Sequence, residues 1–262
     1  MPDLFHSLEA AAARGAAGLD TGARETVCAA LRALQGADGG FAGLDGRSDP
    51  YYTLFAWLGL RALGAPCDRG RLCAYMAAWR GGSALDARCA RFVLAAEGAR
   101  RRRPYLRMAA ECLRGDAYGA FLSALTAGTP PRWLTRLGLR RMAGGAGWAR
   151  RLAALPTPRL AAGLVLATLA GTDDAAWRRA LETRRCPGGG YAAAPGAGAD
   201  LLATAVARFA LSPEGGTEAR DLAFVEACWM ADGLFGASPT AARGDAEHTF
   251  YALLALGGAR RG

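Results

Sequence analysis

The sequence contains no lysine: all 32 of its basic residues are arginine, against 23 acidic residues, which gives a formal net charge of +9. Alanine and glycine are also heavily used, so we attribute this bias to genome composition. No nucleic-acid-binding motif occurs, and the aromatic residues are not interleaved with the arginines. The charge therefore favours a solvated arginine-rich surface, and we expect no nucleic-acid partner. Four consecutive arginines at 100–103 precede Pro104 and predict an exposed loop, with an anionic partner or membrane surface as the alternative.

Other familiar signals are also missing. No apolar run reaches the roughly 18 residues of a membrane span, so we expect no transmembrane segment, while peripheral membrane contact stays open. The N-terminus lacks the basic region and apolar core of a secretory signal. Seven cysteines are scattered without a CxxC pair, which argues against a disulfide framework or zinc finger and predicts reduced thiols in the cytoplasm. Lipase-type, zincin, Walker and Rossmann motifs do not occur.

Helical periodicity dominates the chain, and short clusters of glycine, proline and aspartate interrupt it. No strand-like alternation occurs, and 52% of the residues are apolar. We predict helices near 3–14, 22–35, 50–63, 69–79, 85–97, 105–113, 117–127, 131–142, 158–170, 174–184, 199–211, 217–230 and 246–259. Setting the first aside leaves six consecutive pairs.

The paired helices are of two kinds, which differ in how their apolar residues are distributed. One set is apolar nearly all round, at 51–63, 160–169, 201–211 and 249–256, and such helices must be buried on every side. The alternate helices, such as 174–184 and 217–230, are amphipathic. Alternating buried and half-exposed helices predict an inner ring surrounded by an outer ring. The sequence thus predicts one all-α domain spanning 1–262.

The turns between helices also repeat. Segments 35–41, 186–191 and 228–235 each place glycines before an aromatic residue, and weaker echoes occur elsewhere. Their spacing of about 30 to 45 residues suits helical-pair repeats. These turns resemble the prenyltransferase and squalene-oxidase repeat, which protein prenyltransferase β subunits share with squalene–hopene-type terpene cyclases. The resemblance implies an α/α toroid (α6/α6 barrel) of six helical hairpins around a central apolar cavity for an isoprenoid or polyene.

The resemblance also suggests a metal site. In the β subunits, an Asp-x-Cys and a later histidine bind zinc; here Asp200 and His248 are similar to the aspartate and the histidine. Leu202 stands at the cysteine position and offers no donor atom, which argues against zinc. Glu247 could replace the thiolate only if its side chain turned inward. The turn 192–199 also lacks the cations that would hold a prenyl diphosphate. We therefore expect no cofactor, with zinc as the alternative.

Acid chemistry needs neither zinc nor diphosphate. The cyclases of this family protonate a double bond or epoxide with an aspartate at the start of an inner helix. The nearest string to their motif, at 171–174, lacks the first aspartate and is expected to cap an outer helix. Asp200 with His248 is the candidate acid–base pair, with Glu247 as a further catalytic candidate. The alternative is that Asp200 and His248 merely cap their helices.

Aromatic residues in the inner helices are the candidate substrate-binding residues. Aromatic faces can stabilise a carbocation, although apolar helices also need large residues for packing. The candidates are Tyr51, Tyr52, Phe55, Trp57, Tyr118, Phe121, Phe250 and Tyr251.

Three functions follow from these features. The first is a terpenoid-processing enzyme that binds an apolar substrate for metal-free, acid-initiated cyclisation or isomerisation. The second is a prenyltransferase-type enzyme that needs zinc or a partner subunit. The third is a non-catalytic scaffold for a hydrophobic ligand or a protein.

Overall fold

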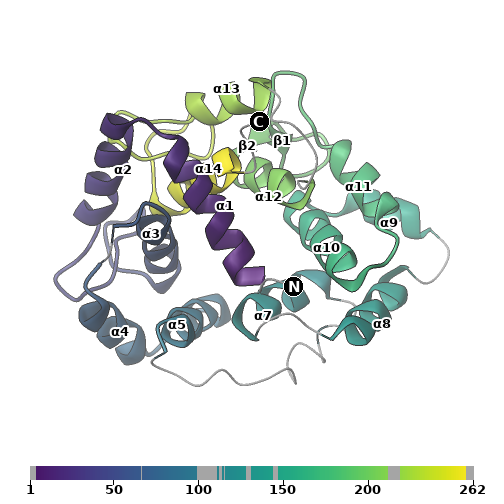
Figure 1. The fold of residues 1–262 in the computed structure, drawn as a ribbon, viewed down its shortest axis with the longest axis horizontal. Helices are drawn as coiled ribbons and strands as arrows, with labels where there is room; N and C mark the ends of the chain where they lie inside the picture. Colours follow the sequence, from purple (N-terminus) through teal and green to yellow (C-terminus); the bar gives the residue numbers. More distant parts are fainter. Residues whose placement is uncertain are drawn as a thin grey trace. The chain divides into compact units, whose positions relative to one another are not determined.

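In a computed structural model, the described regular secondary structure is almost entirely α-helical (Figure 1). The structure describes residues 4–65, 67–98, 111, 114, 116–127, 131–143, 147–211 and 219–257. The helices of this part are α1 (Leu4–Gly18), α2 (Thr21–Ala33), α3 (Pro50–Ala62), α4 (Arg69–Ala78), α5 (Ala84–Ala96), α7 (Ala117–Ala127), α8 (Arg132–Ala143), α9 (Trp148–Ala154), α10 (Thr157–Ala170), α11 (Ala175–Glu182), α12 (Leu201–Leu211), α13 (Ala219–Ala227) and α14 (Ala246–Gly257). The prediction of an all-α protein is confirmed.

The helix bounds agree with the predicted ones to within a few residues, with three exceptions. Helix α9 was not predicted; it has only seven residues, too few for a periodic pattern. Strands β1 (Tyr191–Ala192) and β2 (Ala199–Asp200) pair antiparallel, with Tyr191 opposite Asp200. The predicted helix 105–113 lies outside the described residues, Glu111 excepted, and so does the arginine run 100–103. No described helix is both long and apolar enough to cross a membrane.

The chain divides into two compact units. The terminal unit comprises residues 9–102 and 225–262, and the middle unit comprises residues 1–8 and 103–224. In the terminal unit, α3 packs against α14, α5 and α2; in the middle unit, α10 packs against α12, α7, α8 and α11. That 1–262 forms a single domain stays a prediction.

The helices at the centre of each unit are those with apolar residues on all sides. Helix α10 buries nine residues and α3 buries eight, whereas α11 buries only Trp177 and Leu181. Burial of a helix on every side requires apolar residues around its whole circumference. The predicted distinction between enclosed and half-exposed helices is therefore confirmed within each unit.

Three of the repeated turns share one local structure. In each, the aromatic residue after the glycines donates its backbone N–H to a threonine four residues into the next helix. The pairs are Phe41 with Thr53 at 2.8 Å, Tyr191 with Thr204 at 2.9 Å and Phe235 with Thr249 at 3.0 Å. An aspartate stands four residues before each threonine, namely Asp49, Asp200 and Asp245. These contacts align the three repeats residue by residue.

The turn glycines bring each of these turns against a neighbouring helix. Gly39 has φ +90°, and a Cβ there would lie 2.5 Å from the carbonyl oxygen of Arg71 in α4. Gly189 has φ +98°, and its Cβ would lie 2.2 Å from the carbonyl oxygen of Arg220 in α13. Gly233 has φ +81°, and its Cβ would lie 2.8 Å from the side-chain methyl group of Thr26 in α2. Only glycine combines this backbone conformation with so close an approach.

We predict that Thr249→Val destabilises the protein by about 1–3 kcal/mol, because the buried N–H of Phe235 loses its acceptor. Valine keeps the volume and β-branching of threonine, so packing changes little. Chemical denaturation measures the free energy of unfolding. Thr168→Val is the matched control: Thr168 is exposed, and its hydroxyl bonds only within its own helix and to Asp174. Equal effects at the two threonines would contradict the prediction.

Candidate active site

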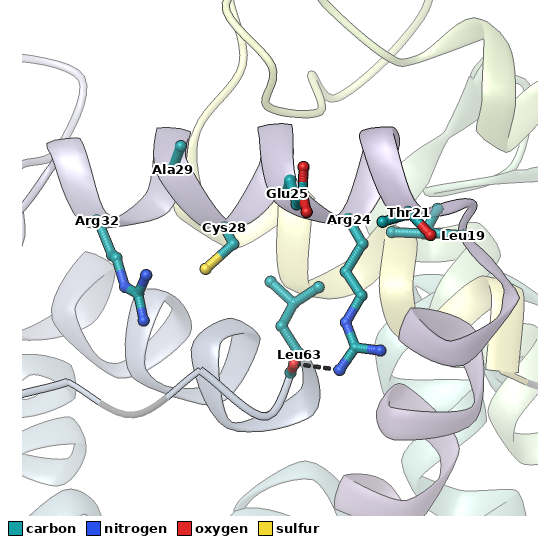
Figure 2. Close-up of a pocket in the computed structure, with 8 residues that line it drawn as sticks. All are labelled: Leu19, Thr21, Arg24, Glu25, Cys28, Ala29, Arg32 and Leu63. Atoms are coloured by element: carbon teal, nitrogen blue, oxygen red, sulfur yellow. Dashed lines mark hydrogen bonds between the residues drawn. The ribbon is translucent and has the colours of Figure 1, made fainter.

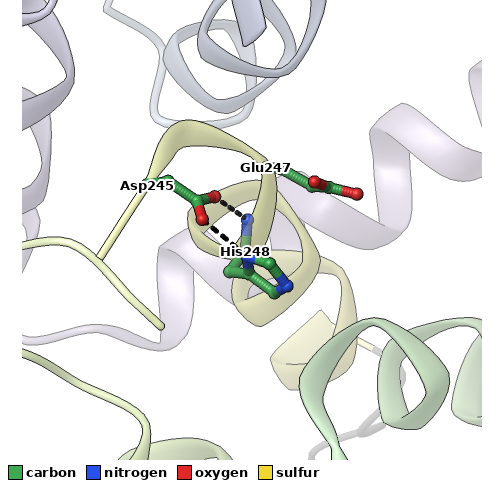
Figure 3. A group of neighbouring side chains, drawn as sticks. All are labelled: Asp245, Glu247 and His248. Atoms are coloured by element: carbon green, nitrogen blue, oxygen red, sulfur yellow. Dashed lines mark hydrogen bonds and ion pairs between the residues drawn. The ribbon is translucent and has the colours of Figure 1, made fainter. Parts of the chain in front are cut away.

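The first turn of α14 holds a hydrogen-bonded Asp–His pair. Asp245 Oδ1 accepts a bond from the backbone N–H of His248 at 2.8 Å, and Oδ2 lies 2.8 Å from His248 Nδ1 (Figure 3). An ionised carboxylate is only an acceptor, so Nδ1 carries the proton in this bond. Both side chains are largely buried, with 9% and 15% of their surface exposed. Asp245 thus caps the helix and orients the imidazole, a group that can exchange protons near neutral pH.

Glu247, in the same turn, contacts helix α3. The Tyr51 hydroxyl donates to Glu247 Oε1 at 2.5 Å, and only 9% of the Glu247 surface is exposed. Because α3 and α14 pack together within the terminal unit, this bond joins residues 196 positions apart in the sequence. The bond orients the carboxyl group, whose second oxygen can carry a proton when the group is neutral.

An aromatic cluster continues from Tyr51 along α3 and α14. The ring centroids of Tyr51 and Phe55 are 4.9 Å apart, and Phe55 lies 5.3 Å from Tyr251 and 5.8 Å from Phe250. Tyr52 meets Tyr51 edge-on at 5.6 Å. The structure therefore assembles five of the predicted substrate-binding aromatics next to Glu247 and His248.

Tyr52 stays protonated at this site. Burial raises the pKa of its hydroxyl, and the negative charges of Asp245, Glu247 and Asp49 raise it further. A neutral phenol can donate a hydrogen bond to a carboxylate or a ligand. Asp49 itself caps α3 through the N–H groups of Tyr51 and Tyr52.

Four predicted residues lie elsewhere. Trp57 is 1% exposed, and its indole N–H donates to Glu97 at the end of α5, so it packs apart from this cluster. Tyr118, Phe121 and Asp200 belong to the middle unit. Tyr118 is exposed, and Phe121 packs on a cluster built from α7, α8 and α10. The pairing of Asp200 with His248 joins residues of different units and stays a prediction.

Asp200 caps α12 by accepting the N–H of Ala203 at 2.8 Å. This is the role that Asp245 has in α14, where His248 occupies the position of Ala203. Our sequence interpretation assigned no role to Asp245. Its spacing could have indicated one, because a side chain at the N-cap lies beside the residue three positions later.

The same three residues form a possible metal-binding group. The donor atoms of Asp245, Glu247 and His248 lie within 4.8 Å of one another. Asp245 Oδ2 and His248 Nδ1 bind each other, however, so these two atoms would have to separate to bind one ion. Leu202, half-buried, supplies no donor. The expectation of no cofactor, with zinc as the alternative, therefore stays a prediction.

A separate pocket of about 560 Å³ lies between α2 and the end of α3 (Figure 2). Its lining residues are Leu19, Thr21, Arg24, Glu25, Cys28, Ala29, Arg32 and Leu63. The guanidinium of Arg24 already donates to the carbonyl of Leu63 at 2.6 Å. None of the predicted site residues lines this pocket, so it is not the predicted apolar cavity.

Comparison of the chain with protein-family models, with curated proteins and with solved structures gives no match in any of the three.

Proposed function

We propose that the chain is an enzyme that isomerises or cyclises an apolar polyene of the isoprenoid class by metal-free proton transfer. The observation that supports this proposal is two hydrogen-bonded pairs, Tyr51–Glu247 and Asp245–His248. They lie beside the aromatic cluster of α3 and α14. Acid–base groups and a largely apolar wall are what such a substrate needs.

In this proposal Glu247 takes up a proton, and its neutral form is the acid. Its proton adds to one carbon of a double bond, whose π electrons form the new C–H bond and leave a cation on the more substituted carbon. The rings of Phe55 and Tyr251 stabilise that cation through their π faces. His248 Nε2 then takes a different proton from the neighbouring carbon, which restores a double bond. Proton return from His248 to Glu247 through solvent completes the cycle without an added reactant.

We further infer that the repeats close into the predicted α/α toroid. Within the terminal unit, α14 of the last repeat packs against α3 of the first. The turn at Gly233 packs on α2, and the turn at Gly39 packs on α4. The last repeat therefore contacts the first repeat, and the first contacts the second. A closed ring of repeats requires such contacts between neighbours.

Solvent deuterium tests the chemistry. Farnesol, geranylgeraniol and squalene lack a diphosphate, so only protonation can start their reaction. In ²H₂O we expect one of them to give an isomeric product that carries one solvent deuteron, measured by mass spectrometry of the extracted product. If none is consumed, or the product carries no deuterium, the proposal is wrong.

The prenyltransferase alternative predicts different results. It requires about one zinc per chain by elemental analysis, held through Asp200 and His248, and zinc-dependent release of pyrophosphate from farnesyl diphosphate, unless a partner subunit completes the site. The scaffold alternative predicts a co-purified lipid or bound protein, seen by native mass spectrometry, with no turnover.

A further inference from the structure

Helix α8 presents an apolar face to solvent. Trp133 is 68% exposed, the largest exposure of any bulky apolar side chain in the described ranges, and Leu137, one turn later, is 37% exposed. The opposite face is buried: Leu134 and Leu139 pack into the middle unit, where α8 lies against α10. Exposing a tryptophan and a leucine on adjacent turns is unfavourable in water and typical of a binding surface.

Positive charge surrounds this face. Between residues 117 and 172 the sequence has seven arginines and no acidic residue. Arg136 of α8 donates to the carbonyl oxygens of Ala170 and Gly171. The other five arginines of α8 and of α9, which follows it (both labelled in Figure 1), are exposed: Arg132, Arg140, Arg141, Arg150 and Arg151. Helix α9 is anchored through buried Leu152 in the same apolar cluster as Leu139. The surface thus combines an apolar centre with basic surroundings and has no acidic residue of its own.

This combination favours an anionic lipid surface over other polyanions. Tryptophan and leucine next to arginines are typical of interfacial helices, in which the apolar side chains enter the headgroup region and the cations meet the lipid phosphates. A nucleic acid would match the charge but would leave Leu137 without an apolar environment. With 12 residues, α8 is too short to span a bilayer, so the expected contact lies along the membrane surface.

We propose that the α8 face, defined as Trp133, Leu137 and the five arginines named above, docks the protein on an anionic membrane. The contact needs no assumption about the reaction, because it rests on the exposed surface of the middle unit. It would also give an enzyme of the proposed type direct access to lipid-dissolved polyenes.

Vesicle sedimentation tests the proposal. The full-length protein is mixed with vesicles of phosphatidylcholine alone or with one third phosphatidylglycerol. We expect at least tenfold tighter binding to the anionic vesicles, weakened by salt. Trp133→Ala/Leu137→Ala is expected to weaken binding about tenfold through lost apolar burial, and Arg140→Glu/Arg141→Glu by at least as much.

Two matched controls distinguish binding through this face from non-specific hydrophobic binding and from an effect of net charge. Leu85→Ala removes another exposed leucine, 45% exposed in α5, and Arg47→Glu reverses another exposed arginine; both variants should bind like the wild type. Circular dichroism checks that all variants fold. Equal binding to both vesicle types, unchanged binding by the Trp133→Ala/Leu137→Ala protein, or binding to an RNA oligonucleotide without binding to vesicles would overturn the proposal.

Discussion

Glu247→Gln is expected to lower the turnover of the responsive polyene about 10²–10⁴-fold, the range typical of a lost general acid. The amide nearly matches the carboxyl group in size and still accepts the Tyr51 hydroxyl bond, so the site keeps its shape. What it loses is the acidic proton. The effect should therefore fall on kcat, with KM nearly unchanged, since binding of the apolar substrate depends on the aromatic cluster. Product formation in single-turnover assays measures it.

Two variants make this result specific. Glu226→Gln removes an exposed carboxylate from α13 and should leave turnover unchanged. Tyr51→Phe keeps the aromatic ring and removes only the hydroxyl that orients Glu247, so we expect a smaller loss, of about tenfold. If Glu247→Gln turns over like the wild type while Asp200→Asn is inactive, the acid is Asp200, and the assignment of Glu247 is wrong.

Asp245 acts on the reaction only through His248 and is a positioning residue. Asp245→Asn keeps a side chain that can cap the helix but replaces the acceptor charge beside Nδ1. The protonated ring is then less stabilised, so the limb of the pH–rate profile that reports His248 should move to lower pH. A variant that changed only stability would leave that profile in place.

The sequence predicted the helices well because each is long, apolar on a definable face and bounded by glycine or a capping residue. For example, Asp49 and Pro50 mark the start of α3, and the structure begins the helix at Pro50. It could not predict α9, whose seven residues start after Gly147 without a side-chain cap. The two-residue strands were missed because they contain too few residues to alternate.

The candidate site was predicted by residue type but not by partner. Glu247, His248 and five of the eight candidate aromatics are close together, because α3 and α14 pack against each other. The sequence did not reveal that Asp245 binds His248 or that Tyr51 binds Glu247. The first contact depends on the rotamer of a capping residue, and the second joins helices almost 200 positions apart. Trp57 shows the opposite error: an aromatic residue on the correct helix serves packing and bonds Glu97.

A buried ion pair distinguishes the fifth repeat, formed by α11 and α12, from the first, formed by α2 and α3, and the last, formed by α13 and α14. Asp221 of α13, 1% exposed, lies 3.2 Å from the guanidinium of Arg208 and 3.3 Å from that of Arg185, and it accepts the N–H of Gly190 at 2.9 Å. Burial lowers the pKa of Arg208, 7% exposed, because it disfavours the charged form. In the first repeat, Trp57 stands at the position of Arg208 and Leu72 at that of Asp221. In the last repeat, the corresponding residues are Leu253 and Val27.

The sequence of the turn explains why the fifth repeat has this ion pair in place of two apolar residues. In the first and last repeats an aspartate of the turn, Asp38 or Asp232, accepts the N–H two residues later at 3.0 Å. Gly188 stands at that position in the fifth repeat and has no side chain, so Asp221 supplies the acceptor from the neighbouring helix. Arg208 in turn neutralises Asp221.

Asp221→Val is therefore expected to destabilise the protein by about 3–5 kcal/mol, because Arg208 loses its buried counter-ion and Gly190 its acceptor. Adding Arg208→Leu should recover most of that loss, since it recreates the apolar pair of the last repeat, and Gly188→Asp should recover about 1 kcal/mol more by restoring the turn acceptor. An added Cβ at Gly188 meets no atom within 4 Å, so the site has room.

Chemical denaturation measures the free energy of unfolding of each variant. Arg179→Leu, which changes an exposed arginine, is the control and should have an effect near zero. If the double variant were no more stable than Asp221→Val alone, the ion pair would be needed for more than replacing a missing turn aspartate.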